Sequence, residues 1–235
     1  MKKNIESKLH ANLQANLQAN LTELVFILDR SGSMGGLESD TIGGFNSMLK
    51  KQQAETGECR ITTILFDYDY EVLHDRIDIK AVKQMTENEY FVRGSTALLD
   101  AVGQTINKIG KAQKNTAKEY QADKVLFVIT TDGMENASRE FSYRKIQSMI
   151  KHQKSKYNWE FIFLGANIDA VEVASHLGID SNRAQSFHND SAGISRNYEV
   201  LSATVSSYRS TSKDQTFADD WSVSIEEDYQ QRNKS

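Results

Sequence analysis

The sequence predicts an α/β fold: a Rossmann-like open sheet, mostly parallel, with one antiparallel hairpin at its edge and helices on both faces. Short apolar runs at residues 24–28, 125–129 and 161–164 are rich in β-branched and aromatic side chains. Such runs are typical of strands that are buried on both faces. Amphipathic segments lie between them, and this alternation of strand and helix builds parallel sheets.

The hairpin is predicted from two strands that lie too close in sequence for a parallel connection. Residues 60–66 and 70–73 both have strand character, and only Asp67, Tyr68 and Asp69 separate them. A parallel crossover needs about a dozen residues or more. These two strands should therefore pair in antiparallel fashion.

Helices are expected where apolar residues recur at helical spacing. The first four predicted helices cover residues 39–56, 97–113, 138–154 and 168–177. Gly57 and Gly178 end the first and the last of these, since glycine readily adopts the conformation that stops a helix. A weak strand at residues 184–187 follows. The final helix presents an apolar stripe made of Ile194, Tyr198, Leu201, Val205 and Tyr208.

Composition and charge exclude several classes of protein. The chain of 235 residues contains no proline, which rules out collagen-like chains and proline-rich stalks. Its net charge of −4 argues against a nucleic-acid binder, which needs a basic surface. The single cysteine, Cys59, cannot form an internal disulfide. Apolar runs fall far short of the ~20 residues that span a bilayer, and the N-terminus lacks the apolar core of a signal peptide. We therefore expect a cytoplasmic protein without membrane contact.

Three regions are predicted along the chain. Residues 1–20 form a low-complexity arm in which leucine recurs every fourth residue. One interpretation is that this arm is a helix that packs on a partner protein or on a second copy of the chain. The other is that it is an expanded repeat without stable structure. Residues 21–209 form the α/β domain. Residues 210–235 lack sustained periodicity and are expected to be a flexible acidic tail, in which Trp221 belongs either to a docking motif or to a solubilising segment.

The candidate site lies in the loops at the carboxyl ends of the strands, where open α/β sheets bind ligands. Asp29, Ser31 and Ser33 follow the first strand, Thr96 opens a helix, and Asp132 follows a later buried strand. Two carboxylates with several hydroxyls, and neither thiolate nor imidazole, are hard oxygen donors that suit Mg²⁺ or Mn²⁺. The alternate spacing of the first three residues lets one turn direct three oxygens to a single point.

Each part of this site also has a simpler interpretation. Thr96 stands where a helix N-cap belongs and can serve only as that cap. Asp132 and the following Gly133 can be an ordinary turn. Residues 31–36 are glycine-rich and can hold a phosphate on backbone N–H groups. All three loops fall at one predicted edge of the sheet, and this coincidence favours the metal site.

At this point the sequence resembles a known family. The segment DRSGS at residues 29–33, Thr96 in GST and Asp132 in TDG match the five-residue metal-ion-dependent adhesion site of von Willebrand factor type A domains. The resemblance covers residues 21–208. It implies that Ser31 and Ser33 ligate the metal directly and that Thr96 does so directly or through water. It also implies that Asp29 and Asp132 act mainly through waters and that a partner's carboxylate fills the open position.

The resemblance implies a protein-interaction module without enzymatic activity. Because no signal peptide is recognised, the chain is most similar to the stand-alone intracellular bacterial members, which serve as adaptors or subunits of larger complexes. Two alternatives stay open. One is a Mg²⁺-dependent phosphohydrolase that uses Asp29 as nucleophile or base, with Arg30 and Arg93 near the loops to hold phosphate. The other is a structural subunit that assembles through the arm of residues 1–20.

Overall fold

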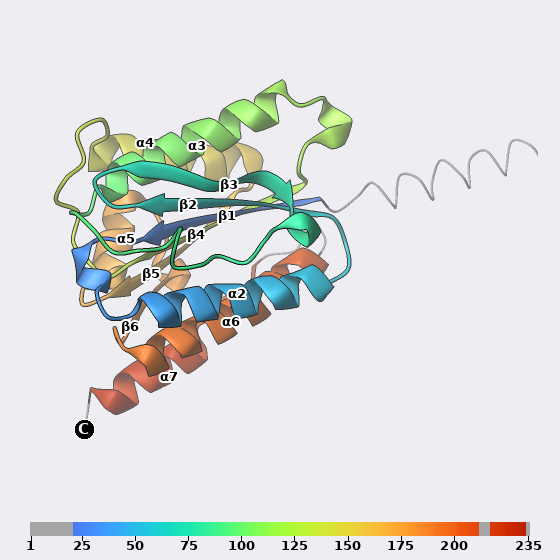
Figure 1. Ribbon diagram of the computed structural model, residues 1–235. Coiled ribbons are helices and arrows are strands. Elements are labelled where there is room, and N and C mark those ends of the chain that lie inside the picture. Colours follow the sequence, from blue (N-terminus) through green and yellow to red (C-terminus); the bar gives the residue numbers. More distant parts are fainter. Residues whose placement is uncertain (1–20, 212–216, 234–235) are drawn as a thin grey trace, which may run out of the picture.

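The computed structural model describes residues 21–211 and 217–233 as one α/β domain built on a six-stranded sheet, with strand order β3-β2-β1-β4-β5-β6 (Figure 1). β2 and β3 pair antiparallel, and the other neighbouring strands pair parallel. The predicted fold class is confirmed. The strands are β1 (Thr22–Asp29), β2 (Cys59–Phe66), β3 (Tyr70–Asp78), β4 (Lys124–Thr131), β5 (Glu160–Ala166) and β6 (Ala184–Phe187).

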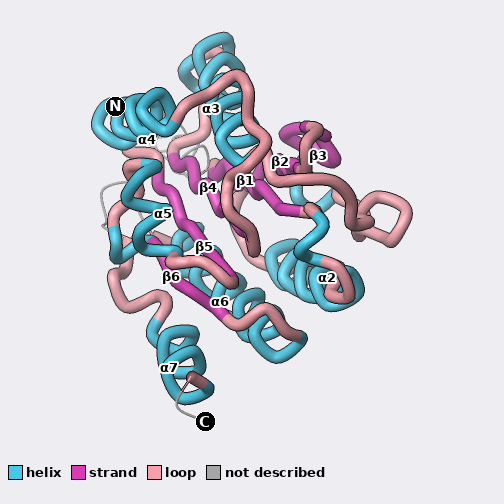
Figure 2. Tube along the Cα trace, turned by 90° about the vertical axis from the view of Figure 1, so that its left-hand side faces the viewer, coloured by secondary structure: helices cyan, strands magenta, loops and turns pink. Residues whose placement is uncertain are grey.

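Helices cover both faces of the sheet, as Figures 1 and 2 show. The helices on one face are α2 (Glu38–Ala54), α6 (Ser191–Ser210) and α7 (Val223–Arg232), and those on the other are α3 (Leu98–Asn115), α4 (Tyr143–Tyr157) and α5 (Ala170–Leu177). Each face therefore has its own apolar core. None of the helices in the described ranges is long and apolar enough to cross a membrane.

The continuous apolar runs of the sequence follow from this two-sided burial. In β1, Leu24 and Phe26 pack into the core beneath α2 and α6, whereas Val25 and Ile27 pack into the core beneath α3. Successive side chains of a strand point to opposite faces. A strand that is covered on both sides is consequently apolar along most of its length, as Leu24 to Leu28 are.

The C-terminal segment differs from the expected flexible tail. Residues 217–233 include the helix α7, and Phe217, Trp221 and Ile225 are buried against the sheet and α6. The physical reason is that burial of these apolar side chains is favourable, even though acidic residues surround them; Ile225 lies in α7, and Phe217 and Trp221 lie in the turn segment before it. The predicted arm of residues 1–20 lies outside the described residues.

Candidate metal centre

The predicted site residues meet where the chain connections on either side of β1 diverge. β1 lies between β2 and β4. The connection from β1 to β2 runs through α2 on one face of the sheet, and the connection from β3 to β4 runs through α3 on the other; open α/β sheets bind ligands at such a position. Asp29 is the last residue of β1, and Asp132 directly follows the last residue of β4. Thr96 lies just before α3. The structure brings these three loops to one point.

Asp29 is fixed by neutral hydrogen-bond donors. Its side chain is 2% exposed, its Oδ1 accepts from the Ser31 backbone N–H at 2.7 Å, and its Oδ2 accepts from the Thr131 hydroxyl at 2.6 Å. Burial raises the pKa of Asp29 to about 6, against an ordinary 3.8, and these hydrogen bonds oppose the rise. The carboxylate therefore has a set orientation, but it has no positively charged partner among the residues that the structure describes.

A chain of short contacts links the two serines to the second carboxylate. The Ser31 and Ser33 hydroxyls lie 3.1 Å apart, and the Ser33 hydroxyl donates to Asp132 Oδ1 at 2.5 Å. The Asn189 amide donates to Asp132 Oδ2 at 3.0 Å. Burial raises the pKa of Asp132 as well, and the hydrogen bonds from Ser33 and Asn189 oppose it. Ser33 itself is exposed, so the centre opens to solvent on that side.

Thr96 completes the group without serving as a helix cap. The N-cap position of α3 is Ala97, which makes no side-chain cap, and Glu135 instead accepts from the Leu99 N–H at 2.9 Å. A Cβ added to Gly133 would lie 3.1 Å from the Thr96 hydroxyl and 3.2 Å from the Ser33 hydroxyl. Both hydroxyls therefore face the small space above Gly133, which only glycine leaves open.

This donor set fits a hard divalent cation. It offers carboxylates from Asp29 and Asp132 and hydroxyls from Ser31, Ser33 and Thr96, all of which Mg²⁺ or Mn²⁺ accepts. Within residues 21–211 and 217–233, there is no cluster of three or more His, Cys, Asp or Glu residues that could hold a metal. A site that depends on hydroxyls has few formal charges, so the bound cation would keep affinity for a further anionic ligand.

The structure adds residues that sequence reasoning missed. The Tyr90 hydroxyl donates to the Asp29 backbone carbonyl at 2.6 Å, and Asn136 Oδ1 accepts from the Thr96 N–H at 2.9 Å. Thr131, whose hydroxyl donates to Asp29, was also missed. It did have a sequence signal, because it lies beside the predicted ligand Asp132 in the TDG motif. Tyr90, Asn136 and Asn189 come from loops whose approach to the site depends on the tertiary fold.

A buried ion-pair network lies next to the centre. Arg30 is fully buried, its Nε donates to Asp67 Oδ2 at 2.9 Å, and its guanidinium also pairs with Glu71 at 2.8 Å. Arg93 donates to the same Asp67 oxygen at 2.8 Å and pairs with Asp69. These contacts tie the hairpin turn to the loops that carry Asp29 and Thr96.

No protein-family model matches the sequence, and no match was found among curated proteins. Solved structures with a similar fold include a von Willebrand factor type A protein from Catenulispora acidiphila, with TM-score 0.55 and 14% identity over 79% of this chain and 42% of that one. The von Willebrand factor domain of the type V pili tip protein Mfa5 from Porphyromonas gingivalis gives TM-score 0.56 and 12% identity over 82% of this chain and 97% of that one.

Proximal thread matrix protein 1 from the mussel byssus, solved with zinc in its adhesion-site motif, gives TM-score 0.53 and 11% identity over 80% of this chain and 46% of that one. This chain thus spans less than half the length of the Catenulispora and mussel structures. At such low identities the likeness concerns the fold. The chain adopts the von Willebrand factor type A fold.

Proposed function

We propose that this chain is a non-enzymatic, divalent-metal-dependent protein-interaction module of a bacterial cytoplasm, where it serves as adaptor or subunit of a larger complex. In this proposal Mg²⁺, or Mn²⁺, is held directly by Ser31 and Ser33 and directly or through water by Thr96. Asp29 and Asp132 hold it mainly through waters. The bound cation supplies Lewis acidity, and an Asp or Glu side chain of the protein partner binds at the open position.

The observation that carries the proposal is the imbalance of charge at the centre. Asp29 and Asp132 are each 2% exposed, and within the described part of the chain their hydrogen-bond donors are all neutral. A buried carboxylate without a positive partner is costly to ionise. A divalent cation among these oxygens would remove that cost. The exposed Ser33 hydroxyl leaves a side from which an external ligand can approach.

The surface around the centre supports a protein as the ligand. Three large apolar side chains are exposed in the surrounding loops: Tyr68 at 54%, Phe91 at 43% and Met134 at 71%. Tyr68 packs over Gly94, whose carbonyl accepts from the Gly32 N–H of the site loop at 3.1 Å. Exposed aromatic and methionine side chains gathered near one polar site are typical of protein interfaces.

The ion pairs of the two nearby arginines favour a binding module over the phosphohydrolase. A phosphohydrolase would need a free Arg or Lys to hold the phosphate. Arg30 is buried and paired with Asp67 and Glu71, and Arg93 is paired with Asp67 and Asp69. Both guanidinium groups are therefore occupied within the protein.

Metal-dependent capture of a partner tests the proposal. The tagged protein is incubated with cell extract in Mg²⁺, washed and eluted with EDTA, and the eluted proteins are identified by mass spectrometry. The proposal predicts a partner that EDTA releases and that the Ser31→Ala/Ser33→Ala variant does not capture. A matched control, Ser155→Ala/Ser175→Ala, changes two exposed serines on α4 and α5 and should capture it normally. A partner that stays bound in EDTA and to the site variant contradicts the proposal.

A further inference from the structure

The positive charge of this chain is concentrated on two neighbouring helices. The helix α4 contains no acidic residue and five cationic ones, which are Arg144, Lys145, Lys151, Lys154 and Lys156. Its neighbour α3 has one acid, Asp100, and three cations, which are Lys108, Lys111 and Lys114. The two helices pack side by side on one face of the sheet, as Figures 1 and 2 show. A chain with a net charge of −4 thus has one strongly basic face, formed by α3 and α4.

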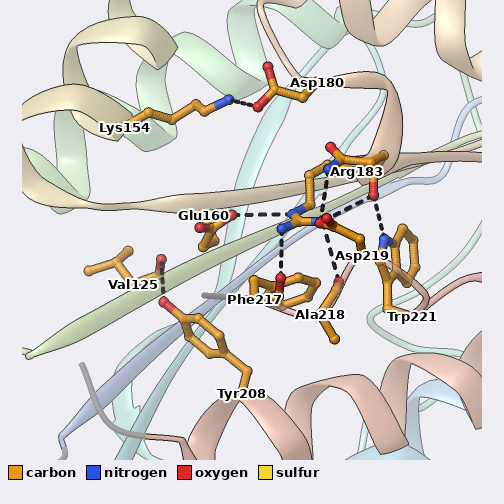
Figure 3. Close-up of polar contacts among 11 residues, drawn as sticks. Val125, Lys154, Glu160, Asp180, Arg183, Tyr208, Phe217, Ala218, Asp219 and Trp221 are labelled. Atoms are coloured by element: carbon orange, nitrogen blue, oxygen red, sulfur yellow. Dashed lines mark hydrogen bonds and ion pairs between the residues drawn. The ribbon is translucent and has the colours of Figure 1, made fainter. Parts of the chain in front are cut away.

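Most cations of the basic face are not used inside the protein. Lys108 pairs with Asp75 at 2.7 Å, and Lys154 pairs with Asp180 at 2.5 Å, the second of which Figure 3 shows. The remaining six cationic residues of α3 and α4 are exposed and make no ion pair with any residue that the structure describes. Their charge is therefore open to an external anion.

The stability of α4 does not account for its charge. Cations stabilise a helix in its last turn, where Lys154 and Lys156 lie, but they destabilise its first turn, which is the positive end of the helix dipole. Arg144 and Lys145 lie in that first turn, and no acidic residue accompanies them there. The helix thus carries positive charge along its whole length against its own dipole, as expected of a surface that binds an anion.

A groove of about 580 Å³ lies between the C-terminal ends of α3 and α4. Lys111, Lys114 and Lys156 line it, and the acid among its described lining residues is Asp123, whose carboxylate accepts from the Leu21 N–H at 3.3 Å. The groove lies where β4 begins, whereas the metal centre lies where β4 ends. This strand has eight residues, so roughly 25 Å separate the two places. The groove is therefore distinct from the metal centre.

Two amide side chains in the groove indicate which anion fits. Gln113 Nε2 and Gln153 Oε1 are shielded from solvent and have no hydrogen-bond partner among the described residues. Gln113 Oε1 already accepts from the Ala122 N–H at 3.1 Å, so its Nε2 group is the donor left over. A peptide group supplies both the acceptor and the donor that these two atoms lack. A phosphodiester backbone supplies acceptors alone, so the groove favours a polypeptide over a nucleic acid.

We propose that the basic face is a second docking surface, which binds an acidic segment of a partner protein. The carboxylates of that segment lie beside the exposed cations of α3 and α4. One of its peptide groups bonds with the amides of Gln113 and Gln153 in the groove. This binding needs no metal ion, so it does not rest on the proposed metal-dependent function. With both surfaces in use, one chain holds two proteins at opposite edges of its sheet.

The test measures binding of a fluorescent peptide of alternating glycine and glutamate to the full chain by anisotropy, in EDTA and low salt. The peptide should bind, and added salt should weaken the binding because it screens exposed charges. A matched peptide with glutamine in place of glutamate should bind at least about tenfold more weakly. An oligothymidylate of the same length that binds as tightly as the acidic peptide would overturn the proposal, as would equal binding of the two peptides.

Substitutions at exposed positions locate the binding without threatening the fold, which circular dichroism checks. Lys111→Gln/Lys156→Gln should weaken binding of the acidic peptide about fivefold, since each exposed ion pair contributes modestly. Lys50→Gln/Lys80→Gln removes the same charge from exposed positions outside α3 and α4 and should bind as the wild type does. Gln153→Leu changes no charge and should weaken binding about threefold, because a peptide group loses its acceptor. Equal binding by the two lysine variants would overturn the proposal.

Hydrogen exchange shows where the peptide lies and keeps the two proposed surfaces apart. The bound peptide should slow amide exchange at residues 107–114 and 152–159, and protection at residues 29–33 instead would overturn the proposal. Ser31→Ala/Ser33→Ala should bind the peptide as the wild type does, whether or not the metal centre proves correct. In the capture experiment above, a wash with ~0.5 M NaCl before EDTA removes proteins held by the basic face.

Discussion

Two sets of buried carboxylates lie at the same edge of the sheet and are neutralised in different ways. Asp67 is fully buried and receives charged hydrogen bonds from Arg30 and Arg93. Asp29 and Asp132 are almost as buried, yet their donors are neutral hydroxyl, amide and backbone groups. Since a buried charge is tolerated only with compensation, the first set is complete within the protein. In the proposed function, an external cation completes the second set.

The largest expected effect on the free energy of unfolding comes from Asp67, whose charge is compensated by Arg30 and Arg93. Asp67→Ala leaves the buried Arg30 with the partly exposed Glu71 as its one remaining carboxylate partner among the described residues. We expect a loss of about 3 kcal/mol or more in the free energy of unfolding, measured by urea denaturation, and the same loss with and without Mg²⁺. A loss of the size of a surface ion pair, about 1 kcal/mol or less, would show that this network is not a buried structural unit.

The second effect, at the metal centre, has the opposite sign: removing a buried carboxylate should raise the free energy of unfolding of the metal-free protein. The pKa of Asp29 is about 6 in the folded protein against an ordinary 3.8, so the folded state binds this proton more tightly than the unfolded state does. Without metal, ionised Asp29 therefore costs about 3 kcal/mol at pH 7, and this cost disappears as pH falls through 6 toward 4. Asp29→Asn should stabilise the metal-free protein at pH 7 and have little effect near pH 4.

Urea denaturation in EDTA at several pH values measures this difference. Asp220→Asn, at an exposed position before α7, is the matched control. It should leave the free energy of unfolding unchanged at pH 7 and near pH 4. With Mg²⁺ present the wild type should gain stability, whereas Asp29→Asn should not. The comparison fails if Asp29→Asn destabilises the metal-free protein at pH 7 as Asp67→Ala does.

The smallest effect concerns the apolar rim, which we define as the exposed side chains Tyr68, Phe91 and Met134 around the centre. Tyr68→Ala should weaken binding of the captured partner about fivefold, in keeping with a loss of about 1 kcal/mol from an interface aromatic. Its Mn²⁺ affinity should stay that of the wild type. Tyr120→Ala, at a tyrosine that is 59% exposed in the loop after α3, is the control. If Tyr68→Ala and Tyr120→Ala bind the partner equally well, Tyr68 does not contribute to the interface.

The fold was predictable because its signals are local. A strand such as β1 must be apolar on both faces, and the short connection at Asp67 to Asp69 permits only a hairpin. The co-location of Asp29, Ser31, Ser33, Thr96 and Asp132 was predictable too, since the carboxyl ends of parallel strands share one edge. Their role as ligands stays a prediction that metal binding must test.

The remaining features depend on contacts between distant segments. Arg30 lies inside the DRSGS motif, and only the return of the chain at Asp67 shows that it is an ion-pair partner. Asn189 has no sequence signal, because its role depends on how β6 and α7 place its loop. The buried C-terminal segment did leave a signal in its apolar residues Phe217, Trp221 and Ile225, which the surrounding acidic residues obscured.

The most direct test of the central claim is a Mn²⁺ titration of the metal-free protein by calorimetry, with Mg²⁺ as competitor. We predict one Mn²⁺ per chain, displacement by Mg²⁺, and affinity at least about tenfold lower in Ser31→Ala/Ser33→Ala. The Ser155→Ala/Ser175→Ala control should bind as the wild type does. Absence of Mn²⁺ binding by the wild type, or equal binding by the Ser31→Ala/Ser33→Ala variant, would contradict the claim that Asp29 and Asp132 are completed by a cation.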